Sequence, residues 1–165
     1  MPALITRLAT PDDSAAIARI YNQGIAGRTS TFETVPRTAE EIRGWFGTHP
    51  IVVVLRDGAV IAFAASSRWR ARDCYRGIAE LSVYVDETCR GQGAGRAALE
   101  ALLAAAAEAG LWKLLGALFS DNTASRRLML AAGFREVGTF VRQAQLEGVW
   151  RDVVMFERRI PANEK

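Results

Sequence analysis

The segment with the clearest chemical potential is a glycine-rich turn, Arg90-Gly91-Gln92-Gly93-Ala94-Gly95, which lies between an apolar stretch and a long alanine-rich one. At the start of a helix the first backbone N–H groups have no intrahelical partner, and the helix dipole adds positive potential. Glycines let the backbone approach a ligand closely, and Arg90 and Arg96 add charged donors. The pattern predicts a phosphate-binding turn. The alternative is an ordinary helix start that is rich in glycine.

Two well-known glycine motifs do not fit this turn. A Walker A loop needs Gly-Lys followed by Ser or Thr, but Arg96 and Ala97 follow Gly95. A Rossmann fingerprint needs a third glycine where Arg96 stands, and no acidic residue ends a suitable second strand. The turn therefore predicts a phosphorylated ligand of another kind.

The elements that must position this turn follow from apolar periodicity, turn signals and helix caps. Helices alternate with both hairpins and crossovers, which predicts one domain over residues 1–165 with a mixed sheet and helices on its faces. In chain order we expect a strand at 4–8, helices at 12–24 and 38–45, strands at 51–55, 59–67 and 80–86, a helix at 94–109, a strand at 111–119, a helix at 122–132, and strands at 135–142 and 150–159.

Composition narrows the function classes. The 165 residues carry a net charge of +3, and no apolar run approaches the roughly 20 residues that span a bilayer. The arginines are scattered, apart from a cluster at Arg68, Arg70, Arg72 and Arg76, so no nucleic-acid partner and no membrane are expected. Cys74 and Cys89 lack metal-site spacing, which predicts free thiols and no metal. No signal peptide is evident, so we expect a cytoplasmic protein.

Two blocks resemble the GCN5-related N-acetyltransferase (GNAT) family. The first is the strand at 81–85, followed by Arg90-x-x-Gly93-x-Gly95 and a long helix. The second runs from Asp121-Asn122 to Gly133-Phe134, and the resemblance covers residues 4 to about 160. It implies an α/β (mixed α+β) fold with a mostly antiparallel, twisted sheet of about seven strands and about four helices, and acetyl-CoA as cosubstrate. The coenzyme residues that it implies are Val83, Tyr84, Val85, Arg90, Gly91, Gln92, Gly93, Ala94, Gly95, Arg96, Asn122 and Ser125.

Within that family the chain resembles the phosphinothricin branch, and there the arsinothricin N-acetyltransferases, through residues 21–24, 31–34, 69–75, 79–85 and 148–153. Such enzymes acetylate the α-amino group of amino acids with an anionic side chain, which confers antibiotic or herbicide resistance. Arginines bind such anions bidentately, which suits Arg70 and Arg72. Tyr75 offers a hydroxyl and Phe32 an apolar wall. Trp69 and Trp150 are expected either to contact the substrate or to be structural, as aromatic residues of the core or of a dimer interface.

Acetyl transfer needs a neutral amine, and the resemblance puts a catalytic glutamate at Glu80, which we expect to act as general base. Glu80 is predicted to face inward on an apolar strand, where burial would raise its pKa. A salt bridge to Arg72 or another arginine is the alternative, and the two roles are compatible. The N–H groups of Leu81 to Val85 would pair with pantetheine and polarise the thioester carbonyl. Neither Cys74 nor Cys89 has a nearby histidine in the sequence, which favours direct transfer over a covalent intermediate.

The chain also departs from the branch. Met129 stands where phosphinothricin acetyltransferases carry a histidine, and no tyrosine occurs in the helix at 122–132, so the general acid is unassigned. The sole histidine, His49, is expected to be structural or solvated. Two other functions stay open: acetylation of protein N-termini or polyamines, and non-catalytic acetyl-CoA binding. The resemblance further implies a homodimer and a small-molecule amine as substrate.

Overall fold

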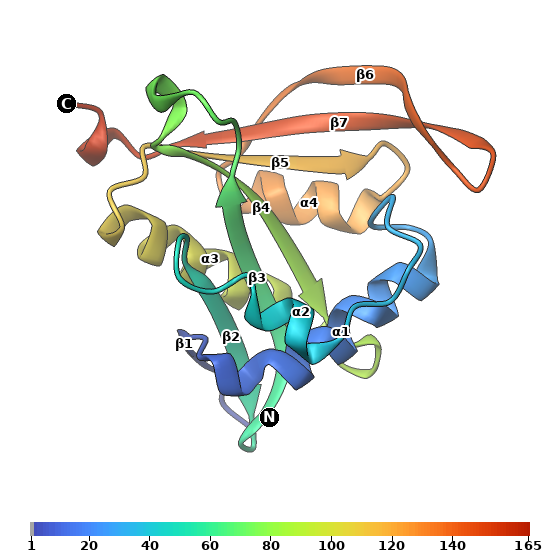
Figure 1. The fold of residues 1–165 in the computed structure, drawn as a ribbon, viewed down its shortest axis with the longest axis vertical. Helices are drawn as coiled ribbons and strands as arrows, with labels where there is room; N and C mark the ends of the chain where they lie inside the picture. Colours follow the sequence, from blue (N-terminus) through green and yellow to red (C-terminus); the bar gives the residue numbers. More distant parts are fainter. Residues whose placement is uncertain (1) are drawn as a thin grey trace.

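The computed structural model describes residues 2–165, which form one seven-stranded sheet with the strand order β1-β2-β3-β4-β5-β7-β6 (Figure 1). Only β4 and β5 run parallel, and all other neighbours are antiparallel. The predicted fold class and element order are confirmed. The elements are β1 (Ile5–Leu8), α1 (Ser14–Gly27), α2 (Ala39–Arg43), β2 (Ile51–Arg56), β3 (Ala59–Arg68), β4 (Ile78–Val85), α3 (Ala94–Glu108), β5 (Lys113–Phe119), α4 (Thr123–Ala131), β6 (Arg135–Leu146) and β7 (Val149–Arg159).

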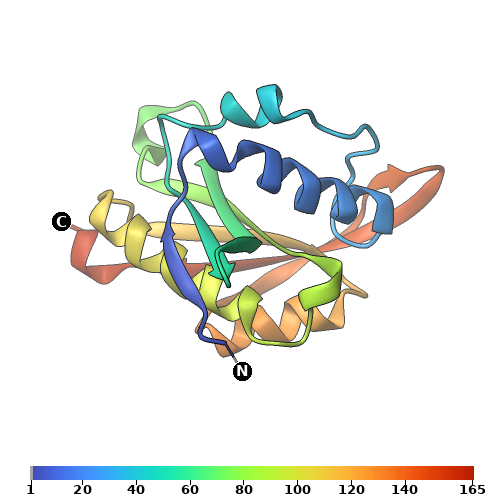
Figure 2. The same ribbon diagram turned by 90° about the horizontal axis from the view of Figure 1, so that it is seen from below.

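Helices cover both faces of the sheet. Figure 2 shows α1 and α2 on one face, with α3 and α4 on the other. Side chains alternate between the faces along each strand: in β3, Phe63 and Ala65 pack in the cluster under α1 and α2, whereas Ala62 and Ala64 pack in the cluster under α3 and α4. Because both faces are covered, the central strands are almost continuously apolar.

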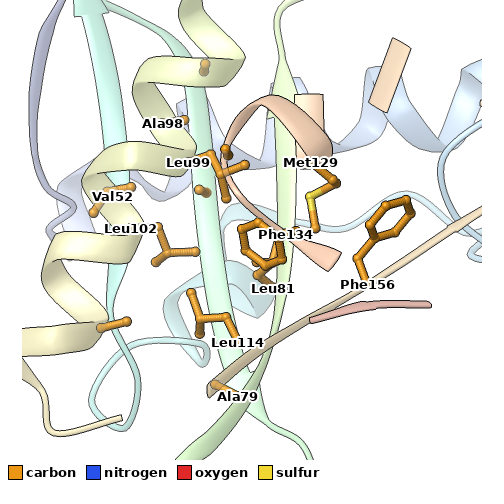
Figure 3. Packing of buried hydrophobic residues seen from close by; sticks show 14 of the residues in the cluster. Val52, Ala79, Leu81, Ala98, Leu99, Leu102, Leu114, Met129, Phe134 and Phe156 are labelled. Carbon is orange, nitrogen blue, oxygen red and sulfur yellow. The ribbon is translucent and has the colours of Figure 1, made fainter. Parts of the chain in front are cut away.

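The larger core lies between the sheet and the helices α3 and α4 (Figure 3). Leu99 and Leu102 of α3 and Phe156 of β7 are fully buried there, and each such side chain stabilises the fold by about 1.5–3 kcal/mol. Met129 of α4 joins this core. A Cβ atom on Gly116 of β5 would stand only 2.4 Å from Met129 Cε, so a larger residue there would require the flexible end of the Met129 side chain to move.

Several element ends differ from the prediction by one to four residues, among them those of β6 and α2. The strand β6 reaches Leu146 rather than residue 142, and it passes two irregularities, between Glu136 and Gly138 and between Phe140 and Ala144. It is an edge strand that is exposed along most of its length, so its residues lack the apolar alternation that marks a half-buried strand. Helix α2 ends at Arg43, not Trp45.

Two negative observations apply to residues 2–165. No helix there is both long and apolar enough to cross a membrane. Nor does this part of the chain gather three or more His, Cys, Asp or Glu side chains in a group that could hold a metal ion.

Candidate active site

The sheet opens between β4 and β5. The two strands pair only from Ile78 opposite Lys113 to Leu81 opposite Gly116. Beyond that point β4 continues to Val85 along β3 alone, so the edge of residues 82–85 that faces β5 has no strand partner. Its backbone groups are free to bind an extended ligand. The result is a slot that passes through the sheet.

A cavity of about 490 Å³ lies at the slot on the side of α3 and α4. Every residue that the resemblance assigned to coenzyme binding lines this cavity, with the exception of Gln92. The lining residues are Thr29, Ser30, Val83, Tyr84, Val85, Cys89, Arg90, Gly91, Gly93, Ala94, Gly95, Arg96, Asn122, Ala124, Ser125 and Leu128.

The glycine turn has the conformation that an anion site requires. Gly91 and Gly93 have φ of 72° and 86°, and Gly93 is the N-cap of α3. The first helical hydrogen bond runs from Ala97 N to Gly93 O at 3.0 Å, so the preceding N–H groups of the first turn have no partner within the helix. Gly95 differs from the other two, because it lies inside α3 and does not have a positive φ. A Cβ at Gly95 would stand 3.3 Å from Val85 Cγ2, so close packing is what favours glycine.

Gln92 turns away from this cavity. Its Oε1 accepts a hydrogen bond from Arg56 Nη1 at 2.6 Å, and its Nε2 donates to Thr88 O at 3.4 Å. The hairpin between β2 and β3 thus holds the Gln92 side chain outside the cavity lining, and the assignment of Gln92 to coenzyme binding stays a prediction.

Asn122 joins two segments at the cavity wall. Its Oδ1 accepts from Ser125 N at 3.2 Å and caps α4, while its Nδ2 donates to Thr29 O at 3.2 Å. The start of α4 is thus fixed to the segment that follows α1. Arg96 pairs with Glu100 on the surface of α3, with Nε 2.7 Å from Oε1.

A second cavity of about 770 Å³ lies on the opposite face, under α1 and α2. Its size is within the range of small-molecule sites, about 300–1,000 Å³. A small third cavity shares Leu81 and Ser82 with it, and shares Val83 and Asn122 with the cavity at the glycine turn. The two large cavities therefore meet through the slot. We call the cavity under α1 and α2 the acceptor cavity, and the cavity beside the start of α3 the donor cavity.

Glu80 stands on the wall of the acceptor cavity. Its neighbours Ala79 and Leu81 are buried in the core under α3 and α4, so alternation along β4 turns Glu80 to the other face. The side chain is exposed to the cavity, and the predicted inward burial is wrong in that respect. The surrounding protein nevertheless desolvates the carboxyl and raises its pKa, as predicted. Within residues 2–165 Glu80 forms no salt bridge, which contradicts the predicted pairing with Arg72.

Of the predicted substrate residues, only Phe32 lines the acceptor cavity, where its ring centroid lies 4.8 Å from that of Phe119. Arg70, Arg72 and Tyr75 lie in the loop between β3 and β4 and do not line it. The loop is held by its own aromatic side chains: Trp69 packs edge-on against Tyr75 at 5.1 Å, and the Arg70 guanidinium lies 4.6 Å from the Trp69 ring centroid. Trp69 therefore organises the loop.

The loop nevertheless begins at the rim of the acceptor cavity. Ser67 pairs with Glu80 across β3 and β4, and both residues line the cavity. The lining contains two carboxylates, Glu33 and Glu80, and among the described residues no lysine or arginine. A cation does contact the lining from outside: the Arg151 guanidinium lies 4.3 Å from the centroid of the Phe119 ring.

Sequence reasoning missed the aromatic floor of the acceptor cavity. Tyr21 of α1 packs edge-on against Tyr84 at 5.0 Å and against Trp45 at 5.3 Å, and burial raises the pKa of both tyrosines. Tyr21 and Glu33 lie in the blocks at 21–24 and 31–34 that carry the family resemblance, but neither was given a role, and the helical spacing of Tyr21 equally describes a core residue. Glu33 forms an ion pair with Arg37 at 3.1 Å.

Comparison with known proteins agrees with the family resemblance found in the sequence. Residues 18–134 match the profile of the Acetyltransferase (GNAT) family. The chain is 34% identical to the phosphinothricin N-acetyltransferase of Alcaligenes faecalis, over 98% of this chain and 85% of that protein. It is 32% identical to the L-methionine sulfoximine/L-methionine sulfone acetyltransferase of Pseudomonas aeruginosa, over 88% of each. The crystal structure of a phosphinothricin acetyltransferase from Sinorhizobium meliloti in complex with acetyl-CoA has a TM-score of 0.89 at 29% identity, covering 95% of this chain and 88% of that one.

Proposed function

The chain belongs to the GNAT family of acetyltransferases, and we propose that it moves the acetyl group of acetyl-CoA to the α-amino group of a small amino-acid analogue. One observation carries the proposal: cavities on opposite faces of the sheet meet through the slot between β4 and β5, and Glu80 lines the acceptor cavity next to Leu81 and Ser82, which line the connection. Such a slot lets a donor and an acceptor approach each other from different sides.

The donor cavity fits acetyl-CoA, which supplies an activated acetyl group as a thioester. The first-turn N–H groups of α3 and the side chain of Arg90 would hold the pyrophosphate. The free edge of residues 82–85 would pair with the pantetheine amides, as a strand pairs with its neighbour. The same N–H groups would polarise the carbonyl that is attacked.

Glu80 is proposed as the general base. An ammonium has no lone pair, so the acceptor must lose a proton before it attacks. Glu80 faces the acceptor cavity, carries no salt bridge in the described chain, and has a raised pKa, which makes its carboxylate a better proton acceptor. Met129 is buried in the core, so α4 offers no acid at that position. A thiolate is a good leaving group, and the proposal needs no general acid.

The proposed acceptors are amino acids of the arsinothricin, phosphinothricin or methionine sulfoximine type, whose side chains end in an anionic arsinate or phosphinate or in a polar, neutral sulfoximine. The names of the two curated relatives support this class. Arg70 and Arg72 would bind the anionic groups from the loop at the rim of the acceptor cavity. Acetylation of such a compound blocks its amino group, and this would confer resistance on the cell.

A panel assay tests the substrate class. Release of free thiol from acetyl-CoA is measured with arsinothricin, phosphinothricin, methionine sulfoximine, glutamate, spermidine and a peptide that begins with Met. We expect kcat/KM to fall in that order for the first three amines, and to be lower for the others. If the peptide or spermidine were the best acceptor, the proposal would fail in favour of an enzyme that acetylates protein N-termini or polyamines.

A variant of Glu80 separates catalysis from binding. Glu80→Gln keeps the shape of the side chain but removes the base, so kcat should fall by about 10²–10⁴ while the Kd of acetyl-CoA stays unchanged. Glu108→Gln changes an exposed carboxylate at the end of α3 and serves as the control. Binding of acetyl-CoA to the wild type with no turnover of any amine would indicate a binding module instead.

A further inference from the structure

The segment from Asp86 to Gln92, which leads into the glycine turn, is held by side chains that line neither large cavity. Arg19 of α1 forms an ion pair with Asp86, and its Nη2 donates to Val60 O at 3.1 Å. Asp86 Oδ1 in turn accepts from Thr88 N at 3.0 Å and from Thr88 Oγ1 at 2.8 Å. The Arg19–Asp86 pair thus ties α1, the start of β3 and the approach to the turn together.

Two further contacts hold the same segment. Gln23, one helical turn after Arg19, accepts a hydrogen bond from Glu87 N at 3.0 Å. Arg56, at the end of β2, donates to Gln92 at 2.6 Å, and Gln92 donates to Thr88 O. The segment is therefore fixed from α1 on one side and from the hairpin between β2 and β3 on the other.

We propose that Asp86, acting with Arg19, is a positioning residue for acetyl-CoA: the pair fixes the turn so that its N–H groups already face the pyrophosphate before the coenzyme binds. The inference rests on the proposed function, since it takes the donor cavity to bind this coenzyme. Asp86 touches no ligand. It acts through the backbone of residues 88–93.

The conformation of the turn explains why such a pair is needed. Gly91 and Gly93 both have positive φ, and a Cβ at either position would meet nothing within 4 Å. The fold around these glycines therefore does not restrict them, and glycine has the widest conformational freedom of all residues. Without an external restraint, ligand binding would have to order the turn, and the lost conformational entropy would weaken the affinity. Asp86 is buried, and its bond to Arg19 lowers its pKa, so the restraint is present across the physiological pH range.

The test compares two acetyl donors. Acetyl-CoA carries the pyrophosphate, whereas S-acetylpantetheine lacks it and occupies only the slot. Asp86→Asn should raise the KM of acetyl-CoA and the Kd of CoA roughly tenfold, leave kcat at saturating acetyl-CoA unchanged, and leave kcat/KM with S-acetylpantetheine unchanged. Arg19→Gln should act in the same way, and Arg19→Lys should restore part of the affinity because it keeps the charge.

The chain provides a matched control. Asp13 is as buried as Asp86, at 7% exposure, and it pairs with Arg7 at 2.7 Å at the start of α1, away from both cavities. Asp13→Asn should lower stability without changing the KM of acetyl-CoA. Equal losses with both donors, or an equal rise in KM for Asp13→Asn, would overturn the proposal. If Asp86→Asn does not fold, Arg19→Gln and Gln23→Ala give the same comparison.

Failure of the positioning role can be distinguished from failure of the proposed function. A wild type that releases no thiol with any amine would refute the acetyltransferase proposal. Calorimetric Kd values for CoA, measured on the wild type and on Asp86→Asn, would then decide the positioning role by themselves. Identical Kd values would refute it, and a roughly tenfold weaker Kd in the variant would support it.

Discussion

At the scale of single residues, Glu80 owes its position to strand alternation. The same β4 places Ala79 and Leu81 in the core under α3 and α4, and Glu80, Ser82 and Tyr84 toward the acceptor cavity. A one-residue slip of the strand would exchange these two sets. Because no arginine pairs with Glu80 within residues 2–165, its carboxylate is available for a proton.

The raised pKa of Glu80 predicts a particular pH dependence. A base with a raised pKa stays protonated, and therefore inactive, to a higher pH than an ordinary glutamate with a pKa of 4.5. Glu80 takes the proton of the bound ammonium, so the reactive form has the carboxylate ionised and the amine still protonated. Below the pKa of Glu80, kcat/KM for the amine should therefore rise by about one log unit per pH unit, and above that pKa it should level off. In Glu80→Gln the levelling should be absent, and kcat/KM should keep rising toward the pKa of the amine. A wild-type profile that also keeps rising without a level region would contradict the assignment.

At the scale of elements, the start of α3 depends on a glycine at Gly93. Replacing a glycine of positive φ by alanine costs about 1–2 kcal/mol. Gly93→Ala should therefore lower the free energy of unfolding by this amount, and it should also raise the Kd of acetyl-CoA, because the new Cβ stands where the phosphate approaches. The measurements are denaturant unfolding and calorimetry.

The other end of the same helix supplies the control. Gly110 has a φ of 79°, and its Cβ would also meet nothing within 4 Å, but it lies outside the donor cavity. Gly110→Ala should lose the same stability and keep the affinity for acetyl-CoA. Equal Kd values of acetyl-CoA for the two variants would show that Gly93 does not contribute to coenzyme binding.

Predictability also differs between elements. The strands β2 and β4, the helix α3 and the glycine turn were predicted because apolar runs, caps and glycines specify them locally. The acceptor cavity was not predicted, because the sequence pattern of Tyr21 and Trp45 is also that of core residues, and their place in the cavity depends on how α1 and α2 lie over the sheet. The position of the Gln92 side chain was not predicted for a related reason: it depends on Arg56, which belongs to a hairpin that is distant in sequence. Local pattern locates the donor site, and tertiary packing decides the acceptor site.

At the scale of the whole molecule, the hairpin of β6 and β7 extends beyond the helices (Figure 1) and exposes Phe140, Val141, Val149 and Trp150. We propose that this surface joins two copies in a homodimer, since exposed apolar patches mark interaction sites. Trp150→Glu should convert the dimer to a monomer in sedimentation velocity. Ile5→Glu, on the exposed edge strand β1, is the control and should leave the mass unchanged. A wild type that sediments as a monomer would refute the dimer.

The arrangement of the two cavities also predicts the kinetic pattern. The donor and the acceptor have separate cavities on opposite faces, joined by the slot, so both can be bound at once. A covalent route would need a nucleophile at the slot. Cys74 is exposed and lines neither large cavity, and Cys89 lies beside Arg90 in the donor cavity, where the phosphates are expected.

Direct transfer through a ternary complex should therefore give intersecting lines in double-reciprocal plots of initial rate at several fixed amine concentrations, whereas a ping-pong route gives parallel lines. The variant Cys74→Ser/Cys89→Ser should keep its kcat, and mass spectrometry after incubation with acetyl-CoA alone should show no added acetyl group on the protein. Parallel lines together with an acetylated cysteine would show that the slot brings a nucleophile, and not only the two substrates, to the acetyl group.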